Sequence, residues 1–470
     1  MALLDHDEDT ICAVATPSGR GGIAVIRVSG SIAYEASRKI CPFLPEKAES
    51  HKVFYGILKD GIESIDEVLA TFFEEGRSFT GEKTVEVSCH GSPIITGQII
   101  QALGKHQVRL ARPGEFTYRA FMSGRIDLIQ AEAVLGLIES GSQRSSQLSL
   151  RQLEGHHSRY LESLEDQLIW ILAQCEANID YSAEDIEIAS NNSILSNLLS
   201  IQKNIQKMLA TYQYGRSLNE GLLVALIGEP NVGKSSLLNA FMGINKAIVT
   251  EVAGTTRDIV EGEVWREGYR IRFMDTAGLR EATDHVEKIG IERSLEASKK
   301  ADMTFLVIDA LFEKPDAFLK AAIVECASAK KLGIICNKSD LQQWSKKEVS
   351  HWIESASKEL GFDMSLAPLF LCSAKTSEGL EEVLAFTVQQ LMDMEKSGED
   401  AVISNQRHFE LLKKADEAVY QGISSTKDGQ SPEFLAFELQ VALIAIQEVL
   451  GKHFDDQVMD RVFKEFCLGK

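Results

Sequence analysis

The segment Gly-Glu-Pro-Asn-Val-Gly-Lys-Ser at positions 228–235 restricts the fold of this chain more than any other feature of the sequence. It fits the pattern G-x-x-x-x-G-K-S, follows an apolar run at 222–227 and precedes a helix-like run at 236–242. A strand, a glycine-rich loop and a helix in this order are the setting that a phosphate-binding loop requires. The glycines let backbone N–H groups face a phosphate, and the helix N-terminus adds positive potential. We therefore predict a nucleotide-binding α/β domain rather than a chance glycine-rich turn.

The side chains of this loop predict individual contacts with a nucleotide. Lys234 can reach the β- and γ-phosphate oxygens, so we predict a catalytic role for it, and the Ser235 hydroxyl can hold Mg²⁺. The other loop residues that we expect to bind the nucleotide are Asn231, Val232, Gly233 and Ser236.

Three later segments follow strand-like runs in the order that a GTPase requires. They are Asp275-Thr276-Ala277-Gly278, Asn337-Lys338-Ser339-Asp340 and Ser373-Ala374-Lys375. Asp275 can bind Mg²⁺ through water, and the N–H of Gly278 can meet the γ-phosphate. We therefore expect the nucleotide to contact Asp275, Thr276, Ala277 and Gly278.

The second and third of these segments predict the choice of base. The carboxylate of Asp340 can accept two hydrogen bonds, from the ring N–H and the amino group of guanine, whereas adenine offers no such pair. Asn337 and Lys338 belong to the same predicted site, and Ser373 and Ala374 would support the base through main-chain N–H groups. A helix cap is the alternative role of Asp340, and the order of the segments disfavours it.

The loop at 250–258, Thr-Glu-Val-Ala-Gly-Thr-Thr-Arg-Asp, is expected to sense the third phosphate. Thr256 is predicted to complete the Mg²⁺ shell, and Thr255 is the second candidate. The residues of this loop that we expect to contact GTP are Thr250, Glu251, Val252, Ala253, Gly254, Thr255 and Thr256.

One position departs from the pattern of Ras-like GTPases, which place a water-orienting glutamine just after the glycine of D-x-x-G. This chain has Leu279 there, so either hydrolysis is slow or another group aligns the water. The following segment, 280–287, supplies carboxylates. The amide oxygen of Asn231 can ligate a monovalent cation that does the electrostatic work of an arginine finger. A turn-stabilising role for Asn231 is equally compatible with its chemistry.

Composition excludes several classes of protein. Lys and Arg total 49 against 69 Asp and Glu, a net charge of −20, so the chain is not a general nucleic-acid coat, and any RNA contact must be local or supplied by a basic partner. The eight cysteines form no C-x-x-C pair, which argues against a zinc ribbon or a disulfide framework and favours core thiols in a reducing compartment. With no signal-like start and no apolar run of about 18 residues, we expect a cytoplasmic protein with no membrane segment.

The 470 residues are enough for about three domains. Residues 1–121 look β-rich and mixed, with strands expected at 11–15, 22–28, 53–58 and 84–89. From about 127 the periodicity becomes helical, and after the nucleotide domain it returns to helical until the end. The predicted domains are an α+β N-terminal domain at 1–121, a helical domain in two parts at 122–220 and 396–470, and a GTPase domain at 221–395.

The two helical blocks are each amphipathic, so we expect them to pack together. The nucleotide domain is then an insertion whose ends lie close together, with 392–398 as the linker back. The predicted fold class is a multidomain α/β chain in which a P-loop domain is inserted into an α-helical domain and preceded by the α+β domain.

Several runs outside the nucleotide motifs point to one family. They are Thr16-Pro17 with Gly21-Gly22 and Arg27, Phe79-Thr80-Gly81-Glu82 with Glu86 and His90-Gly91, Ala111-Arg112-Pro113-Gly114-Glu115-Phe116 with Arg119-Ala120-Phe121, Asp127-Leu128-Ile129-Gln130-Ala131-Glu132-Ala133, and the terminal Phe466-Cys467-Leu468-Gly469-Lys470. With these runs the chain resembles, from end to end, the MnmE (TrmE) family of tRNA-modifying GTPases.

The resemblance implies a K⁺-activated GTPase that hydrolyses GTP to GDP and phosphate. With the flavoprotein MnmG (GidA), which carries FAD, such a protein adds a carboxymethylaminomethyl group to carbon 5 of the wobble uridine of certain tRNAs. It also implies a tetrahydrofolate derivative, 5-formyl- or 5,10-methylene-tetrahydrofolate, in an N-terminal domain that forms the homodimer. The implied partners are a second copy of the chain, MnmG in a heterotetramer, and tRNA.

The resemblance further assigns individual residues. It favours Asn231 as a K⁺ ligand, and it assigns Glu287 to orienting the water and Cys467 to a place near the folate with a part in the chemistry. The remaining assignments are K⁺ contacts at Thr250, Val252 and Thr255 and folate contacts at Arg27, Glu86, Arg125 and Lys470. This chain departs from the family at three of the positions compared: Arg125 replaces the usual Lys, Ser123 the usual Asn, and Ser92 the second glycine of H-G-G.

Two other functions are weighed against this one. A ribosome-assembly GTPase of the Era or Der kind would control binding without covalent modification. Era-like proteins end in a basic RNA-binding KH module, and Der-like proteins have two phosphate loops, whereas this chain ends in a neutral to acidic helical region and has one phosphate loop. A folate-binding protein with a vestigial GTPase is disfavoured by the intact Lys234, Ser235, Asp275 and Asp340.

Overall fold

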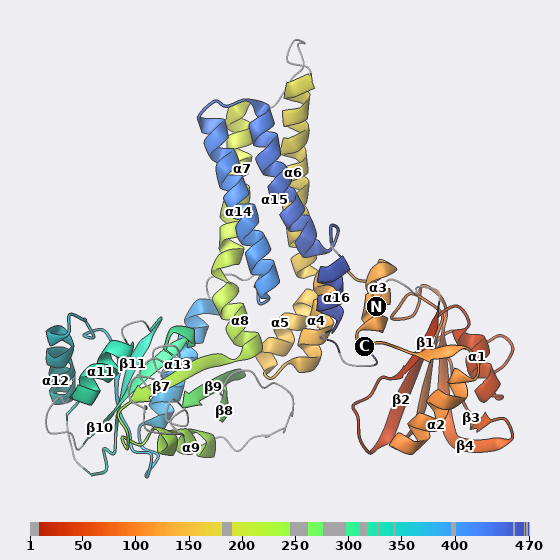
Figure 1. The fold of residues 1–470 in the computed structure, drawn as a ribbon, viewed down its shortest axis with the longest axis horizontal. Helices are drawn as coiled ribbons and strands as arrows, with labels where there is room; N and C mark the ends of the chain where they lie inside the picture. Colours follow the sequence, from red (N-terminus) through yellow and green to blue (C-terminus); the bar gives the residue numbers. More distant parts are fainter. Residues whose placement is uncertain are drawn as a thin grey trace, which may run out of the picture. The chain divides into compact units, whose positions relative to one another are not determined.

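The chain forms two compact units. One comprises 1–135, 152–173 and 439–470, and the other comprises 136–151 and 174–438. The computed structural model (Figure 1) describes residues 9–180, 190–244, 262–275, 298–310, 317–326, 329–341, 345–395, 401–454, 456–464, 466 and 469.

The first unit contains a six-stranded sheet in the order β3-β4-β5-β2-β1-β6. Its neighbours are antiparallel except for the parallel pair β1 and β6. The strands are β1 (Thr10–Val14), β2 (Gly21–Ser29), β3 (Val53–Asp60), β4 (Glu63–Phe73), β5 (Thr84–Gly91) and β6 (Val108–Leu110). The strands predicted from the sequence are confirmed as β1, β2, β3 and β5. The long strand β4 was not predicted, because its first half, Glu-Ser-Ile-Asp-Glu, is too polar to stand out as a strand.

Helices α1 (Ala33–Ile40) and α2 (Pro93–Gly104) bury their apolar residues against this sheet in one core. The Ser92 hydroxyl accepts from the N–H of Ile94 and caps the N-terminus of α2. Gly91 must remain a glycine, because a Cβ there would lie 2.5 Å from the carbonyl oxygen of Gly21 on β2.

The C-terminal end of the chain packs into the same unit. Helix α16 (Asp456–Lys464) lies against α3 (Glu115–Met122), and Phe463 and Phe466 are buried in a cluster with Tyr118. Gly469 is also buried, with φ +91°, and a Cβ on it would lie 2.2 Å from the carbonyl oxygen of Val14. Gly469 therefore lies beside the end of β1.

Long helices complete the first unit. Helix α4 (Leu128–Glu139) begins in it, as does α6 (His156–Asp180), and α15 (Pro432–Leu450) ends in it. Glu165 of α6 accepts hydrogen bonds from Gln447 of α15 at 3.0 Å and from Lys452 at 2.6 Å. Helical segments on the two sides of the nucleotide domain therefore pack together, as the sequence predicts.

The second unit contains a six-stranded sheet in the order β12-β11-β10-β7-β9-β8, parallel except for the antiparallel pair β8 and β9. The strands are β7 (Leu222–Gly228), β8 (Gly262–Arg266), β9 (Tyr269–Asp275), β10 (Met303–Asp309), β11 (Leu332–Asn337) and β12 (Leu369–Leu371). Four helices of the same α/β domain are α9 (Lys234–Ile244), α11 (Ala317–Cys326), α12 (Lys346–Glu359) and α13 (Leu380–Glu395). A predominantly parallel sheet with interleaved helices is the fold that the phosphate loop predicts.

Helices from both sides of this domain pack together in the second unit. Helix α7 (Asn191–Ala210) lies along α14 (Gln406–Lys427), and α8 (Tyr212–Glu220) leads into β7. Helix α5 (Gln143–Leu153) contributes Leu148 to the core of the nucleotide domain.

The chain enters and leaves the nucleotide domain at one place. The backbone N–H of Ile403 donates to the Thr211 hydroxyl at 3.0 Å, and a Cβ on Gly215 would lie 2.2 Å from the carbonyl oxygen of Ile403. The predicted insertion is therefore confirmed in topology, while the predicted domain boundaries stay a prediction.

Two further predictions can be compared with the fold. The linker predicted at 392–398 is wrong for its first part, because α13 continues to Glu395; Met and Glu favour helix over linker.

The thiols of the described residues are buried and form no disulfide, as predicted; they are Cys12, Cys41, Cys89, Cys175, Cys326, Cys336 and Cys372. Among the helices that the structure describes, none is both long and apolar enough to span a membrane.

Candidate nucleotide and folate sites

The phosphate loop connects the end of β7 to the start of α9. Asn231 has φ +64° and Gly233 φ +93°, so the loop makes a turn in the left-handed region. A Cβ on Gly233 would lie 2.4 Å from Nδ2 of Asn337, and one on Gly228 would lie 2.1 Å from the carbonyl oxygen of Val307. Gly228 is therefore required by the close approach of the Val307 backbone, and Gly233 by its left-handed φ and by the Asn337 amide beside it.

Lys234 is 4% exposed at the first position of α9. Its ammonium donates to the carbonyl oxygens of Gly228 at 2.9 Å and Glu229 at 2.8 Å. The Lys234 ammonium is thus held at the loop by two backbone carbonyls, and a phosphate oxygen can replace one of them as its acceptor.

Asn337 joins the phosphate loop to the segment predicted to support the base. It is 1% exposed at the end of β11. Its Nδ2 donates to the carbonyl oxygen of Val232 at 2.8 Å, and its Oδ1 accepts from the N–H of Ala374 at 3.1 Å. Three segments far apart in the sequence therefore meet at one amide.

The neighbouring residues of the Asn-Lys-Ser-Asp segment are also held in place. Lys338 donates to the carbonyl oxygen of Asn231 at 2.9 Å and pairs with Asp309 of β10. Oδ1 of Asp340 accepts from the Ser373 hydroxyl at 2.7 Å, and the Ser373 oxygen accepts from the N–H of Thr376 at 3.2 Å. The carboxylate predicted to recognise guanine is therefore oriented by the Ser-Ala-Lys segment.

Part of the predicted nucleotide site lies outside the described residues. Asp275 ends β9, and its backbone lies beside Leu226 of β7 in the parallel ladder. The predicted residues outside the described part of the chain are Thr250, Glu251, Val252, Ala253, Gly254, Thr255, Thr256, Thr276, Ala277, Gly278 and Glu287, together with Cys467 and Lys470 of the tail.

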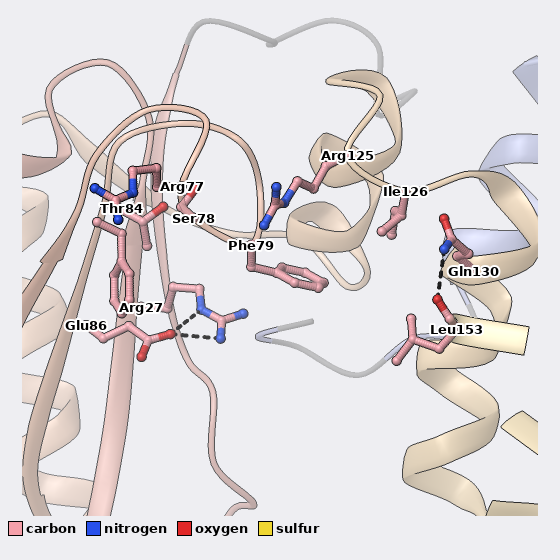
Figure 2. Close-up of a pocket in the computed structure, with 11 residues that line it drawn as sticks. Arg27, Arg77, Ser78, Phe79, Thr84, Glu86, Arg125, Ile126, Gln130 and Leu153 are labelled. Carbon is pink, nitrogen blue, oxygen red and sulfur yellow. Dashed lines mark hydrogen bonds and ion pairs between the residues drawn. The ribbon is translucent and has the colours of Figure 1, made fainter. Parts of the chain in front are cut away.

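A cavity of about 530 Å³ lies in the first unit (Figure 2). Three of the four residues that the resemblance assigns to folate, Arg27, Glu86 and Arg125, line it. Arg27 of β2 and Glu86 of β5 are directly paired in the antiparallel ladder. Nε and Nη2 of Arg27 donate to Oε1 of Glu86 at 2.9 and 2.8 Å, and the two side chains are 17% and 29% exposed. The full lining is Arg27, Phe73, Arg77, Ser78, Phe79, Thr84, Glu86, Arg125, Ile126, Gln130 and Leu153.

Aromatic rings fix the Arg27 guanidinium. Its Cζ lies 5.3 Å from the centroid of Phe79 and 5.7 Å from that of Phe116, distances at which a cation is attracted to a ring face. Gln130 lines the cavity from α4, and its amide donates to the carbonyl oxygen of Leu153 at 2.8 Å. The sequence patterns do not predict Arg77 or Leu153 as cavity residues, whereas Phe79 and Gln130 stand within the runs that carry the family resemblance.

A partly buried network of ion pairs is connected to the cavity lining. Arg119 donates to Glu82 at 3.0 Å and to Glu115 at 3.0 Å, and Arg109 also pairs with Glu115. Burial alone would raise the pKa of the Glu115 carboxyl, but its hydrogen bond to Arg109 and the charges of both arginines leave the pKa below its ordinary value of 4.5. Ser29 links Glu82 to the cavity through hydrogen bonds of 2.7 Å to Glu82 and 3.2 Å to Thr84.

Comparisons with known proteins match both units. The family model "MnmE helical domain" matches residues 128–467, and "GTP-binding protein TrmE N-terminus" matches residues 10–125. The tRNA modification GTPase MnmE of Bdellovibrio bacteriovorus is 48% identical over 477 residues, which cover 99% of this chain and 98% of that protein. The chain belongs to the MnmE family. MnmE of Ligilactobacillus salivarius is 37% identical over 98% of both chains, and MnmE of Porphyromonas gingivalis is 37% identical over the full length of both.

Membership of the MnmE family confirms the resemblance and the predicted fold class. The matched MnmE helical region extends from 128 to 467 and so encloses the whole α/β domain from β7 to α13. This agrees with the hydrogen bond between Thr211 and Ile403, which closes the helical part on both sides of the insertion.

Proposed function

We propose that this member of the MnmE family hydrolyses GTP to GDP and phosphate, and that hydrolysis serves modification of carbon 5 of the wobble uridine in tRNA. The observation that supports this most is the amide of Asn337, which holds the phosphate loop and the Ser373-Ala374 segment in one site. The printed names of the relatives, each a tRNA modification GTPase, support the second half of the proposal.

In this proposal Lys234 binds the β- and γ-phosphates and Asp340 recognises guanine. The ammonium of Lys234 is already at the loop, and the Asp340 carboxylate is already oriented by Ser373. Mg²⁺ would be held by Ser235 and Thr256 and would neutralise charge on the phosphate oxygens. Ser235 fits this part because it follows Lys234 in the first turn of α9. Glu287 orients the attacking water, since Leu279 has no polar group to do so.

A K⁺ ion would be held by Asn231, Thr250, Val252 and Thr255 and would supply the positive charge of an arginine finger. Asn231 fits this role. Its carbonyl accepts from Lys338, and among the described residues its side-chain amide has no hydrogen-bond partner. Its left-handed backbone is part of the turn that faces the phosphates.

The cavity around Arg27 and Glu86 is the proposed site of the tetrahydrofolate derivative that supplies a one-carbon unit. The cavity's size of about 530 Å³ fits a ligand of this class, and it combines aromatic rings with charged hydrogen-bonding groups. The proposed partners are a second copy of the chain, the flavoprotein MnmG with its FAD, and tRNA, in the cytoplasm.

The GTPase half is tested by measuring GTP turnover of the purified chain in K⁺ and in Na⁺ at equal ionic strength. Turnover is expected to be faster in K⁺, and Asn231→Ala is expected to abolish the difference while GDP still binds. Equal rates in the two salts would remove the cation from the proposal. Absence of GTP hydrolysis in both would overturn the proposal itself.

A further inference from the structure

Two arginines that line the cavity have no acidic partner in the part of the chain that the structure describes. Arg77 belongs to the loop between β4 and β5, and Arg125 to the turn after α3; Figure 2 shows both among the lining residues. Among the described residues, neither side chain has a hydrogen bond or ion pair. In contrast, Arg27 in the same cavity and Arg119 behind it are both bound by carboxylates.

The loop that carries Arg77 is fixed by its own hydrogen bonds. The N–H of Gly76 donates to the carbonyl oxygen of Gly81 at 2.7 Å, and the N–H of Arg77 donates to that of Glu74 at 3.0 Å. The Ser78 hydroxyl, which also lines the cavity, donates to the carbonyl oxygen of Glu82. The backbone of Arg77 is therefore held in place without a hydrogen bond from its guanidinium.

The charge of the cavity contrasts with that of the chain. Among the described residues, three arginines and one glutamate belong to its lining, a formal charge of +2, whereas the whole chain has a net charge of −20. The carboxylate, Glu86, is engaged by Arg27. The two remaining cations can therefore attract a ligand with at least two negative groups.

We propose that Arg77, together with Arg125, binds the glutamate tail of the folate, and that the cavity prefers polyglutamylated folates to the monoglutamate. This inference rests on the proposed folate site. Each γ-linked glutamate adds one carboxylate to the tail, and guanidinium groups bind carboxylates through paired N–H donors. Arg27, Glu86 and Phe79, which also line the cavity, remain available to bind the ring end of the folate.

The test is equilibrium binding of 5-formyl-tetrahydrofolate with one and with five glutamates to the purified full-length chain. Arg77 and Arg125 are both exposed to solvent, and the wild type is expected to bind the pentaglutamate about fivefold more tightly than the monoglutamate, as one or two exposed charge pairs allow. Arg77→Gln is expected to weaken binding of the pentaglutamate more than binding of the monoglutamate, and so to reduce this preference. Lys47→Gln, which removes an exposed charge of the same unit outside the cavity lining, is the matched control and is expected to keep the preference. The preference is also expected to shrink as salt is raised.

The possible results of these binding measurements test different parts of the proposal. If neither folate binds, the proposed folate site itself is wrong. If both bind equally, or if Arg77→Gln retains the preference, the tail assignment is wrong. If Arg77→Gln weakens both folates by the same factor, Arg77 only shapes the cavity. If the variant binds both folates as the wild type does but loses affinity for tRNA, the unpaired charge serves RNA phosphate instead.

Discussion

Asn337 donates from Nδ2 to the carbonyl oxygen of Val232 at 2.8 Å, although 105 residues separate the two positions. The bond joins the end of β11 to the phosphate loop, and it explains why Gly233 must lack a side chain, since a Cβ there would touch the same Nδ2. The proposed phosphate and base sites are therefore joined directly, and changes to the proposed base loop are expected to act on nucleotide selection.

Asp340→Asn is expected to lower GTP affinity by about 10–100-fold, because the charged acceptor of guanine's two N–H groups is lost. Xanthine nucleotides are expected to gain affinity, since the amide offers a donor to the carbonyl that replaces guanine's amino group. The measurement is nucleotide binding by competition with GTP and with the xanthine analogue. Asp363→Asn, an exposed site on the same domain, is the control. Full GTP affinity in Asp340→Asn would show that another group recognises the base.

Glu287→Ala is expected to reduce GTP turnover by ~10²-fold with little change in nucleotide affinity, as for loss of a water-orienting group. Single-turnover hydrolysis and GDP binding measured on the same preparation separate the two effects. An unchanged rate would move the role to another carboxylate of the segment 280–287, with Asp284 next.

The sequence predicts the nucleotide domain well because its determinants are local. A strand, a loop and a helix in succession define the phosphate loop, and each later motif follows its own strand, so β7, β9, β11 and β12 appear where the apolar runs place them. The pairing of Arg27 with Glu86 is different. These residues are 59 positions apart, and only the register of β2 against β5 brings them together.

Other contacts depend on tertiary packing and cannot be predicted from the spacing of residues in the sequence. The indole of Trp265 on β8 donates to the carbonyl oxygen of Gly141, and the N–H of Arg144 donates to the carbonyl oxygen of Gly268. These bonds join the segment before and within α5 to the β8–β9 hairpin across more than a hundred residues. Arg77 cannot be predicted from the sequence for the same reason. Its place in the cavity lining depends on how the loop between β4 and β5 folds.

Deleting residues 467–470 is expected to uncouple the two activities. Gly469 is buried beside the carbonyl of Val14, remote in sequence from every nucleotide motif, so GTP hydrolysis should persist while tRNA modification is lost. Phe463 and Phe466 stay in place and keep α16 docked. The measurement pairs a GTPase assay with nucleoside analysis of tRNA. Loss of both activities would mean that the tail maintains the fold, and retention of both would place the one-carbon site elsewhere.

Glu115→Gln is expected to destabilise the first unit at neutral pH by about 3 kcal/mol, because it leaves buried Arg119 with one fewer carboxylate. The pKa of Glu115 is lowered in the folded chain, so its contribution is present above the ordinary value of 4.5 and is lost as the pH falls through the folded pKa. The difference between variant and wild type should therefore shrink in acid. Native-state hydrogen exchange of β1 and β2 amides at several pH values measures it, and a difference independent of pH would contradict the ionic origin.

The most direct test of the central claim is nucleoside analysis of tRNA from cells in which Lys234→Ala replaces the wild-type chain. Lys234 lies at the phosphate loop, and its loss removes the ammonium proposed to bind the β- and γ-phosphates without changing the cavity around Arg27. We predict that the wild-type chain restores the modified wobble uridine to a strain lacking it, whereas Lys234→Ala, present at equal abundance, does not. Full modification supported by Lys234→Ala would contradict the claim that GTP hydrolysis in this chain serves tRNA modification.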